Sequence, residues 1–226
     1  MKKIAAAAIC MVMLTASGRL PEIVQAPAAM DAYQGQPLTI VVQKKATFVA
    51  TTSGRAAFAL LGALASMSAG DQLVKDNDIA DPSVMIADGL ASDLASRFKT
   101  APPTTIHDFD SDAEADIAKA AGGKGLALYV ETTGWGFGYY AFKWGRYHVG
   151  FSMHARLIDA ATGAVIAQAP CKHAFNDEDH APDYDAMMAD QAAFIKKTFA
   201  DGASACVAEL EGKMLGTAQA APAPQP

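Results

Sequence analysis

The stretch YHVGFSMHARLIDAATGAVIAQAPC, residues 147–171, decides the fold of this chain. In its first half, large apolar residues alternate with polar or small ones. This alternation predicts a strand with one buried face and one solvated face. The segment Asp-Ala-Ala-Thr-Gly at 159–163 then turns the chain, with Gly163 in the left-handed position of a three-residue loop. The stretch therefore predicts an antiparallel hairpin.

This turn also predicts a register for the hairpin. It pairs Leu157 with Val165 and Phe151 with Cys171, so Cys171 points into the core. Pro170 indicates that the second strand lies at or near a sheet edge, because proline cannot donate to a ladder.

Local signals predict the elements around the hairpin. Asp81-Pro82 is an N-cap followed by proline at the first helical position. Ser111 and Glu114 form a capping box before a short helix. The expected elements are a strand at 39–42, a helix at 54–70 capped by Ser53, a helix from 82 to about 98, a short helix ending at 122–123, a strand from 126 and a C-terminal helix capped by Asp183.

The pattern predicts an α/β or α+β sandwich. We expect a small mixed sheet that ends in an antiparallel meander, with helices packed on it and a long C-terminal helix. The expected segments are a signal peptide at 1–18, a tether at 19–37, a single α/β domain at 38–215 and a disordered tail at 216–226.

The first eighteen residues are typical of a secretory signal peptide. Lys2 and Lys3 precede the uncharged apolar run 4–16, and cleavage after Gly18 would release a soluble protein. Leu-Thr-Ala-Ser-Gly also resembles a lipobox, with Ser17 where the lipidated cysteine stands. Serine cannot form the thioether, so a lipid anchor requires that Ser17 replaces a native cysteine. We expect a periplasmic or outer-membrane-associated protein.

Charge and cysteine usage narrow the partners and the compartment. Removal of the signal leaves 16 basic residues against 24 acidic ones, a net charge of −8 that argues against nucleic acid and anionic membrane surfaces as partners. Cys171 and Cys206 remain. Cys206 follows Phe199 by seven residues and shares its face of the C-terminal helix, whose candidate kink is Gly202. The two cysteines predict a disulfide in an oxidising compartment, and two buried thiols are the alternative.

The segment Leu157-Ile-Asp-Ala-Ala-Thr-Gly-Ala-Val165 resembles the hairpin motif of bacterial envelope lipoproteins. These include the curli-secretion lipoproteins, the outer-membrane activators of peptidoglycan synthases and the N-terminal domain of the Tol translocation protein. The chain also resembles uncharacterised proteobacterial lipoproteins in Asp81-Pro82, in the segment from Trp135 to Trp144 and in its two cysteine positions. The resemblance implies fold and compartment and carries over no catalytic residue.

The sequence contains no recognisable catalytic or cofactor-binding motif, so we expect no cofactor and no metal. The acidic stretch 107–112 fails the calcium-loop pattern and is better explained by helix capping. His148 and His154 lie on the solvated strand face, too far apart to share a metal. The acidic loop 176–180 is typical of a solvated turn.

The segment 135–147 is the best candidate for a working surface. Its aromatic residues alternate with Gly134, Gly136 and Gly138, so that one face is bulky and the other bare. Aromatic side chains favour interfaces, and packing on the protein's own helices is the alternative. The predicted binding residues are Trp135, Phe137, Tyr139, Tyr140 and Trp144.

We therefore expect a non-enzymatic envelope protein that binds a partner protein or a cell-wall polymer through this segment. The alternative is a periplasmic hydrolase or lyase with a His/Asp site. The uncharged helix 56–70 carries small residues on one side, including Gly62 and Gly70. That side would receive a second helix, either the C-terminal one or that of a second subunit in a homo-oligomer.

Overall fold

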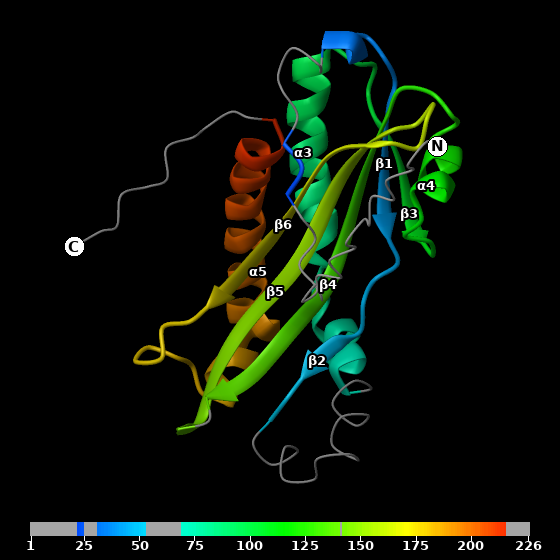
Figure 1. Cartoon of the computed structure of the whole chain (residues 1–226). Helices are drawn as coiled ribbons and strands as arrows, with labels where there is room; N and C mark the ends of the chain where they lie inside the picture. The colour runs from blue at the N-terminus through cyan, green and yellow to red at the C-terminus, as the bar shows by residue number, and fades with distance from the viewer. Residues whose placement is uncertain (1–21, 25–30, 53–68, 141, 216–226) are drawn as a thin grey trace, which may run out of the picture.

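The computed structural model describes residues 22–24, 31–52, 69–140 and 142–215 (Figure 1). The predicted signal peptide, Ser53 and Gly62 lie outside these residues. The described strands are β1 (Leu38–Gln43), β2 (Phe48–Ala50), β3 (Thr104–Phe109), β4 (Leu126–Tyr140), β5 (Lys143–Asp159) and β6 (Val165–Phe175). The described helices are α3 (Pro82–Phe98), α4 (Glu114–Ala120), α5 (Tyr184–Leu215) and a helix at 69–77.

The strands form one mixed sheet in the order β3-β1-β4-β5-β6, with β2 pairing beside β4. β1 runs parallel to β3 and β4, whereas β4, β5 and β6 form the expected antiparallel meander. The fold class is thus confirmed, including the long C-terminal helix. The sequence patterns missed β2 and β3. β6 ends the sheet order, as Pro170 predicted.

The two faces of the sheet are covered differently. α3 and α5 lie side by side on one face, where they enclose the main core (Figure 1). Asp81 caps α3 by accepting a hydrogen bond from the Ser83 N–H, and the predicted row Ile86, Leu90, Leu94 and Phe98 is buried. The opposite face has a smaller apolar cluster, in which Ile117 of α4 meets Val41, Tyr129 and Ile158.

The hairpin has a different register from the predicted one. Phe151 pairs with His173 and Met153 pairs with Cys171, a shift of two residues. The shift arises because the Asp159 N–H bonds the Ala164 carbonyl, and an irregularity follows between Leu157 and Ile158. Gly163 is left-handed as expected, with φ +74°. A two-residue shift preserves the face of each side chain, so Cys171 still points into the core.

One predicted helix detail is wrong. α4 begins at Glu114 after Ala113, and Ser111 instead accepts from the Ala113 N–H and donates to Asp116. Gly70, in the helix at 69–77, packs against β2, since a Cβ on Gly70 would lie 1.9 Å from the Phe48 carbonyl oxygen. The rest of the predicted small-residue side lies almost wholly outside the described residues, and its contact with a second helix stays a prediction.

α5 bends at a different place from the one expected. Asp183 caps the helix by accepting from the Ala186 N–H, as predicted. The backbone leaves helical geometry at Ala189–Ala192, not at Gly202. Gly202 instead lets the helix approach β6, because a Cβ there would lie 2.4 Å from the His173 ring.

Candidate functional site

A β-bulge in β4 determines which side chains of the aromatic segment face the helices. Up to Val130 the even-numbered residues point into the main core, and from Trp135 onward the odd-numbered ones do. The change of parity occurs between Thr132 and Gly134, where Thr133 is the extra residue. Thr132 is buried beside the bulge and donates to the Asp81 carboxylate at 2.6 Å. The N-cap of α3 therefore fixes the position of the bulge.

This parity places the first two predicted binding residues in the core. Trp135 is 3% exposed and Phe137 is 4% exposed. The Trp135 ring packs between Phe48 and Phe199, and its Nε1–H donates to the Ala46 carbonyl at 2.7 Å. Both aromatic side chains thus hold β2 and α5 to the sheet and present almost no surface to a partner.

The rest of the segment lies closer to the solvent. Tyr139 is partly buried against the main core, and Tyr140 packs edge-on to the His148 ring at 5.4 Å. Phe142, at the tip of the β4–β5 hairpin, is 95% exposed. The side chain of Trp144 lies outside the described part of the chain. Binding by these residues stays a prediction.

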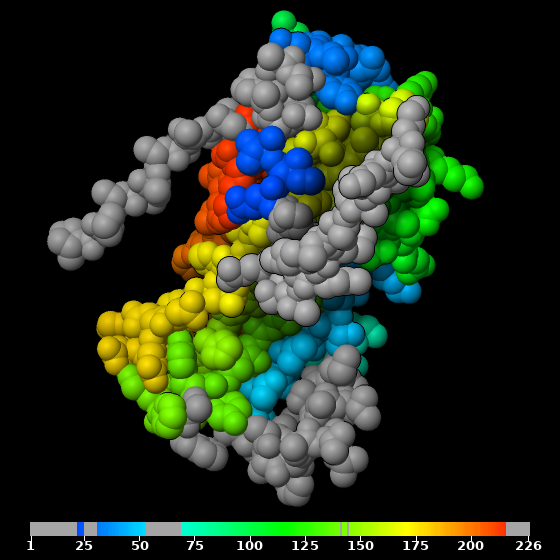
Figure 2. Space-filling model, in the orientation of Figure 1, coloured from blue at the N-terminus to red at the C-terminus, as the bar shows by residue number. Residues whose placement is uncertain are grey.

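The glycines of the segment leave a hollow on the other face of the sheet. Gly134, Gly136 and Gly138 lie opposite Ser152, Gly150 and His148 of β5. The hollow encloses about 640 Å³ between β2 and β6, within the range of roughly 300–1,000 Å³ typical of ligand pockets. Figure 2 shows this face, with β2 in cyan beside the green of β4 and β5. A Cβ at Gly136 would lie 2.0 Å from the Val49 carbonyl oxygen and one at Gly138 would lie 2.8 Å from the His148 ring, so it is at Gly134 that the floor leaves room for a ligand to approach the backbone.

The side chains around this glycine-floored hollow are mostly neutral or basic. They include Thr51, His148, Ser152, Lys172 and Asn176, and no carboxylate lines the hollow among the described residues. Burial lowers the pKa of His148, and the positive charge of Lys172 lowers it further. His148 is therefore a neutral hydrogen-bonding group at pH 7, next to a cationic one.

A polar network continues beyond Ser152 along the same face. Glu131 accepts from the Tyr129 hydroxyl at 3.1 Å and bonds Nδ1 of His154 at 3.0 Å. Burial raises the pKa of Glu131, but the bond to His154 and the charge of Arg156 lower it, and the net shift is downward. Arg156 lies over the Tyr129 ring, with its guanidinium 4.5 Å from the ring centroid, and bonds Glu114 of α4.

Of the polar clusters described above, this network best matches the site that a periplasmic hydrolase would need. Glu131 orients the His154 ring as a partner of a general base would. Within the described residues, no hydrogen bond joins His154 to the neighbouring Ser152, whose hydroxyl instead accepts from Thr133. The same part of the chain contains no group of three or more potential metal ligands.

The other polar stretches serve local structure. Asp177 accepts from the backbone N–H groups of Asp179 and His180 and bonds the His180 ring. Lys143 of the hairpin pairs with Asp179 at 2.6 Å. His107 and Asp108 belong to β3, although the stretch 107–112 was explained by helix capping and no strand was predicted there.

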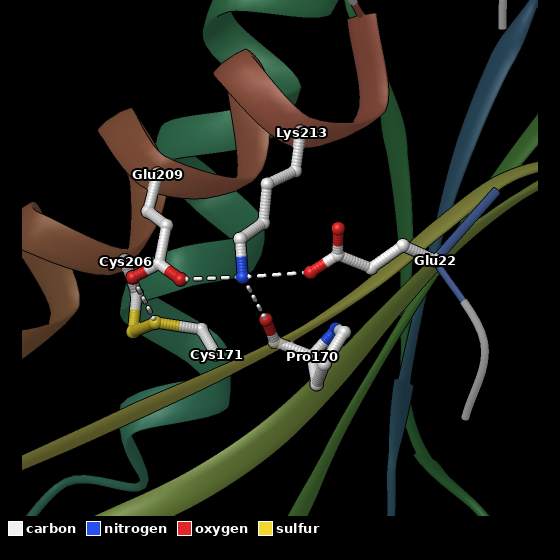
Figure 3. Close-up of a disulfide and its surroundings, with 6 residues drawn as sticks. All are labelled: Glu22, Pro170, Cys171, Cys206, Glu209 and Lys213. Carbon is white, nitrogen blue, oxygen red and sulfur yellow. Dashed lines mark hydrogen bonds and ion pairs between the residues drawn. A yellow bond between two sulfur atoms is a disulfide. The ribbon is translucent and has the colours of Figure 1, made fainter. Parts of the chain in front are cut away.

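The predicted disulfide is confirmed (Figure 3). Cys171 of β6 and Cys206 of α5 are bonded, with their Cα atoms 5.8 Å apart. Two turns further along α5, Lys213 pairs with Glu209 at 2.7 Å and with Glu22 at 3.0 Å. Figure 3 shows these charges gathered beside the bond. The helix thus holds both the edge strand and part of the predicted tether.

The segment at Glu22 also extends the sheet. Ile23 forms an antiparallel bridge with Gln168 on the outer edge of β6. Two residues further along β6, Pro170 has no N–H, so β6 offers no backbone donor there to continue this ladder.

No protein-family model and no curated protein matches the chain. Among solved structures, it is similar to a DUF330-family protein of Xanthomonas campestris, with 13% identity over 83% of this chain and 90% of that one, and a TM-score of 0.40. PelC of Paraburkholderia phytofirmans, described as a dodecamer, matches with 11% identity over 79% and 88%, and a TM-score of 0.34. The lipoprotein GNA1162 of Neisseria meningitidis matches with 15% identity over 62% and 83%, and a TM-score of 0.26.

TM-scores at this level carry no conclusion about function or assembly, and the resemblance to the lipoprotein families stays an expectation. None of the helices in the described ranges has the length and apolar character needed to span a membrane.

Proposed function

We propose that this chain is an exported protein of the bacterial cell envelope that binds a partner protein or a cell-wall polymer and catalyses no reaction. The signal-peptide pattern and the disulfide support export. The glycine-floored hollow carries the proposal of binding, because it is large, open and lined by a few hydrogen-bonding groups. The partner lies along β4, β5 and β6, with Tyr139 and Tyr140 at one end.

The hollow can be filled without disturbing the core. A Cβ at Gly134 would meet only the Ser152 hydroxyl, at 3.4 Å. Gly134→Leu therefore adds a side chain to the floor at little cost in stability. Ala205→Leu is the matched control, because Ala205 lies on the exposed side of α5.

The test measures binding of the mature protein to purified peptidoglycan sacculi and to immobilised envelope proteins. Whichever partner the unchanged protein binds, Gly134→Leu should weaken that binding at least tenfold. Ala205→Leu should bind the same partner with unchanged affinity. Full retention by a folded Gly134→Leu protein would show that the partner binds elsewhere.

The hydrolase alternative rests on the oriented His154–Glu131 pair. It predicts turnover of a cell-wall substrate that His154→Ala abolishes. Capture of a partner that survives His154→Ala and fails in Gly134→Leu would favour the binding function.

A further inference from the structure

The first turns of α5 are joined to the rest of the helix through an unfavourable backbone. Ala189 is extended at φ −55° and ψ 152°, and Asp190, Gln191 and Ala192 follow with φ of +51°, +57° and +58°. These three residues are left-handed, and none is glycine or asparagine. Each such residue lowers the population of the conformation roughly tenfold.

The local sequence favours an uninterrupted helix at this point. Residues 184–201 contain neither glycine nor proline and are rich in alanine, methionine and lysine, which are strong helix formers. A break here is a conflict between local preference and the tertiary structure. Contacts elsewhere must therefore hold the bend.

Those contacts fasten the segment 181–188, the hairpin strap, to the β4–β5 hairpin. The Tyr184 ring packs edge-on to Phe137 at 6.3 Å and to Tyr147 at 5.9 Å. The Tyr147 N–H donates to the Pro182 carbonyl at 3.0 Å, and Arg146 donates to the Ala181 carbonyl. Met187 is fully buried.

The strap nonetheless has room to move. On its other side, Tyr184 and Met188 line a second hollow of about 400 Å³ that reaches the helix at 69–77. The five-residue loop 176–180 precedes the strap. Each of its residues can span up to ~3.3 Å, so the loop can extend when the strap moves.

We propose that the hairpin strap is a releasable latch. In its second state α5 is continuous from Tyr184 to Leu215, the left-handed turn is gone, and Phe137 and Tyr147 are uncovered. The two buried aromatics of the hairpin then become an accessible apolar surface. The proposal stands independently of the hollow, because it needs no partner to be bound there.

Two substitutions at Gln191, whose side chain is exposed, bias the equilibrium in opposite directions. Gln191→Gly relieves the left-handed strain and weakens a straight helix, so it favours the latched state. Gln191→Ala keeps the strain and favours the straight helix. The measurement is hydrogen exchange at the Tyr147 amide, which the latched state protects, with the amides of 126–130 in β4 as an internal reference.

The Tyr147 amide should exchange at least fivefold faster in Gln191→Ala than in Gln191→Gly, while the β4 amides stay the same. Tyr184→Ala should also accelerate the Tyr147 amide alone. Equal rates in both Gln191 variants would overturn the proposal. So would a parallel change in the β4 amides, because that would report global unfolding.

Discussion

Removal of the Cys171–Cys206 bond should reveal how much of the stability comes from tying the edge strand to α5. The bond closes a sequence separation of 35 residues. In the chain-entropy relation, a loop of that length stabilises the folded state by about 3.8 kcal/mol at 25 °C. Cys171 and Cys206 are 3% and 0% exposed, so alanine at both positions leaves no unpaired polar group in the core.

The assay is equilibrium unfolding of the mature protein in urea, for the oxidised protein and the Cys171→Ala/Cys206→Ala variant. We expect the free energy of unfolding to fall by about 4 kcal/mol and the melting temperature by about 10 °C. The m-value should rise, because the uncrosslinked unfolded chain exposes more surface. A loss below about 1 kcal/mol, with the bond verified by thiol labelling, would refute the reasoning that the bond acts on the unfolded chain.

Two further predictions test the core and the helix pair. Trp135→Ala should destabilise by about 3–5 kcal/mol, since it empties a core position, whereas Phe142→Ala at the exposed tip should change the stability by less than ~0.5 kcal/mol; equal effects in denaturant melts would contradict this assignment. Burial and the Asp93 carboxyl raise the pKa of Glu211 to about 7. The folded state then binds the proton more tightly than the unfolded one, so this contribution is complete below about pH 4.5 and is lost as the pH rises through 7. Melting temperatures of Glu211→Gln from pH 5 to 8 should lack that decline, and an unchanged decline would assign it to another group.

The hairpin shows both what the sequence predicts and where it stops. Alternation and Gly163 were enough to predict two strands, their faces and the core position of Cys171. The register was wrong by two residues, because turn bonds at Asp159 and an irregularity at Ile158 decide it. Such bonds depend on a geometry that alternation does not encode.

The missed strands have different causes. β2 spans only three residues and owes its place to packing, with Phe48 and Ala50 buried on either side of exposed Val49. β3 is mostly exposed and pairs with β1 alone. Its run Thr104-Thr105-Ile106 carries a β-branched signal, but the acidic stretch 107–112 that overlaps its end was explained by helix capping.

The aromatic segment was correctly described as bulky on one face and bare on the other, but the sequence did not reveal which face the helices cover. The sequence feature that would have revealed it is a switch, along β4, from even-numbered to odd-numbered positions for the large apolar residues. Leu126, Leu128 and Val130 are even-numbered, whereas Trp135 and Phe137 are odd-numbered, and a single strand can bury both sets only through a bulge between them.

The same bulge explains why the hollow exists. It turns the aromatics toward α5 and leaves the glycines on the face where, among the described residues, α4 is the helix that packs. α4 has seven residues and covers only the end of the sheet near Val41 and Ile158. At the other end, two glycines are required by neighbouring parts of this chain: a Cβ at Gly136 would lie 2.0 Å from the Val49 carbonyl oxygen, and one at Gly138 would lie 2.8 Å from the His148 ring. Gly134 differs, because a Cβ there would meet only the Ser152 hydroxyl, at 3.4 Å. Glycine weakens a strand interior, so Gly134 is the floor position whose missing side chain the packing of this chain does not explain, and the Gly134→Leu variant tests whether a partner explains it.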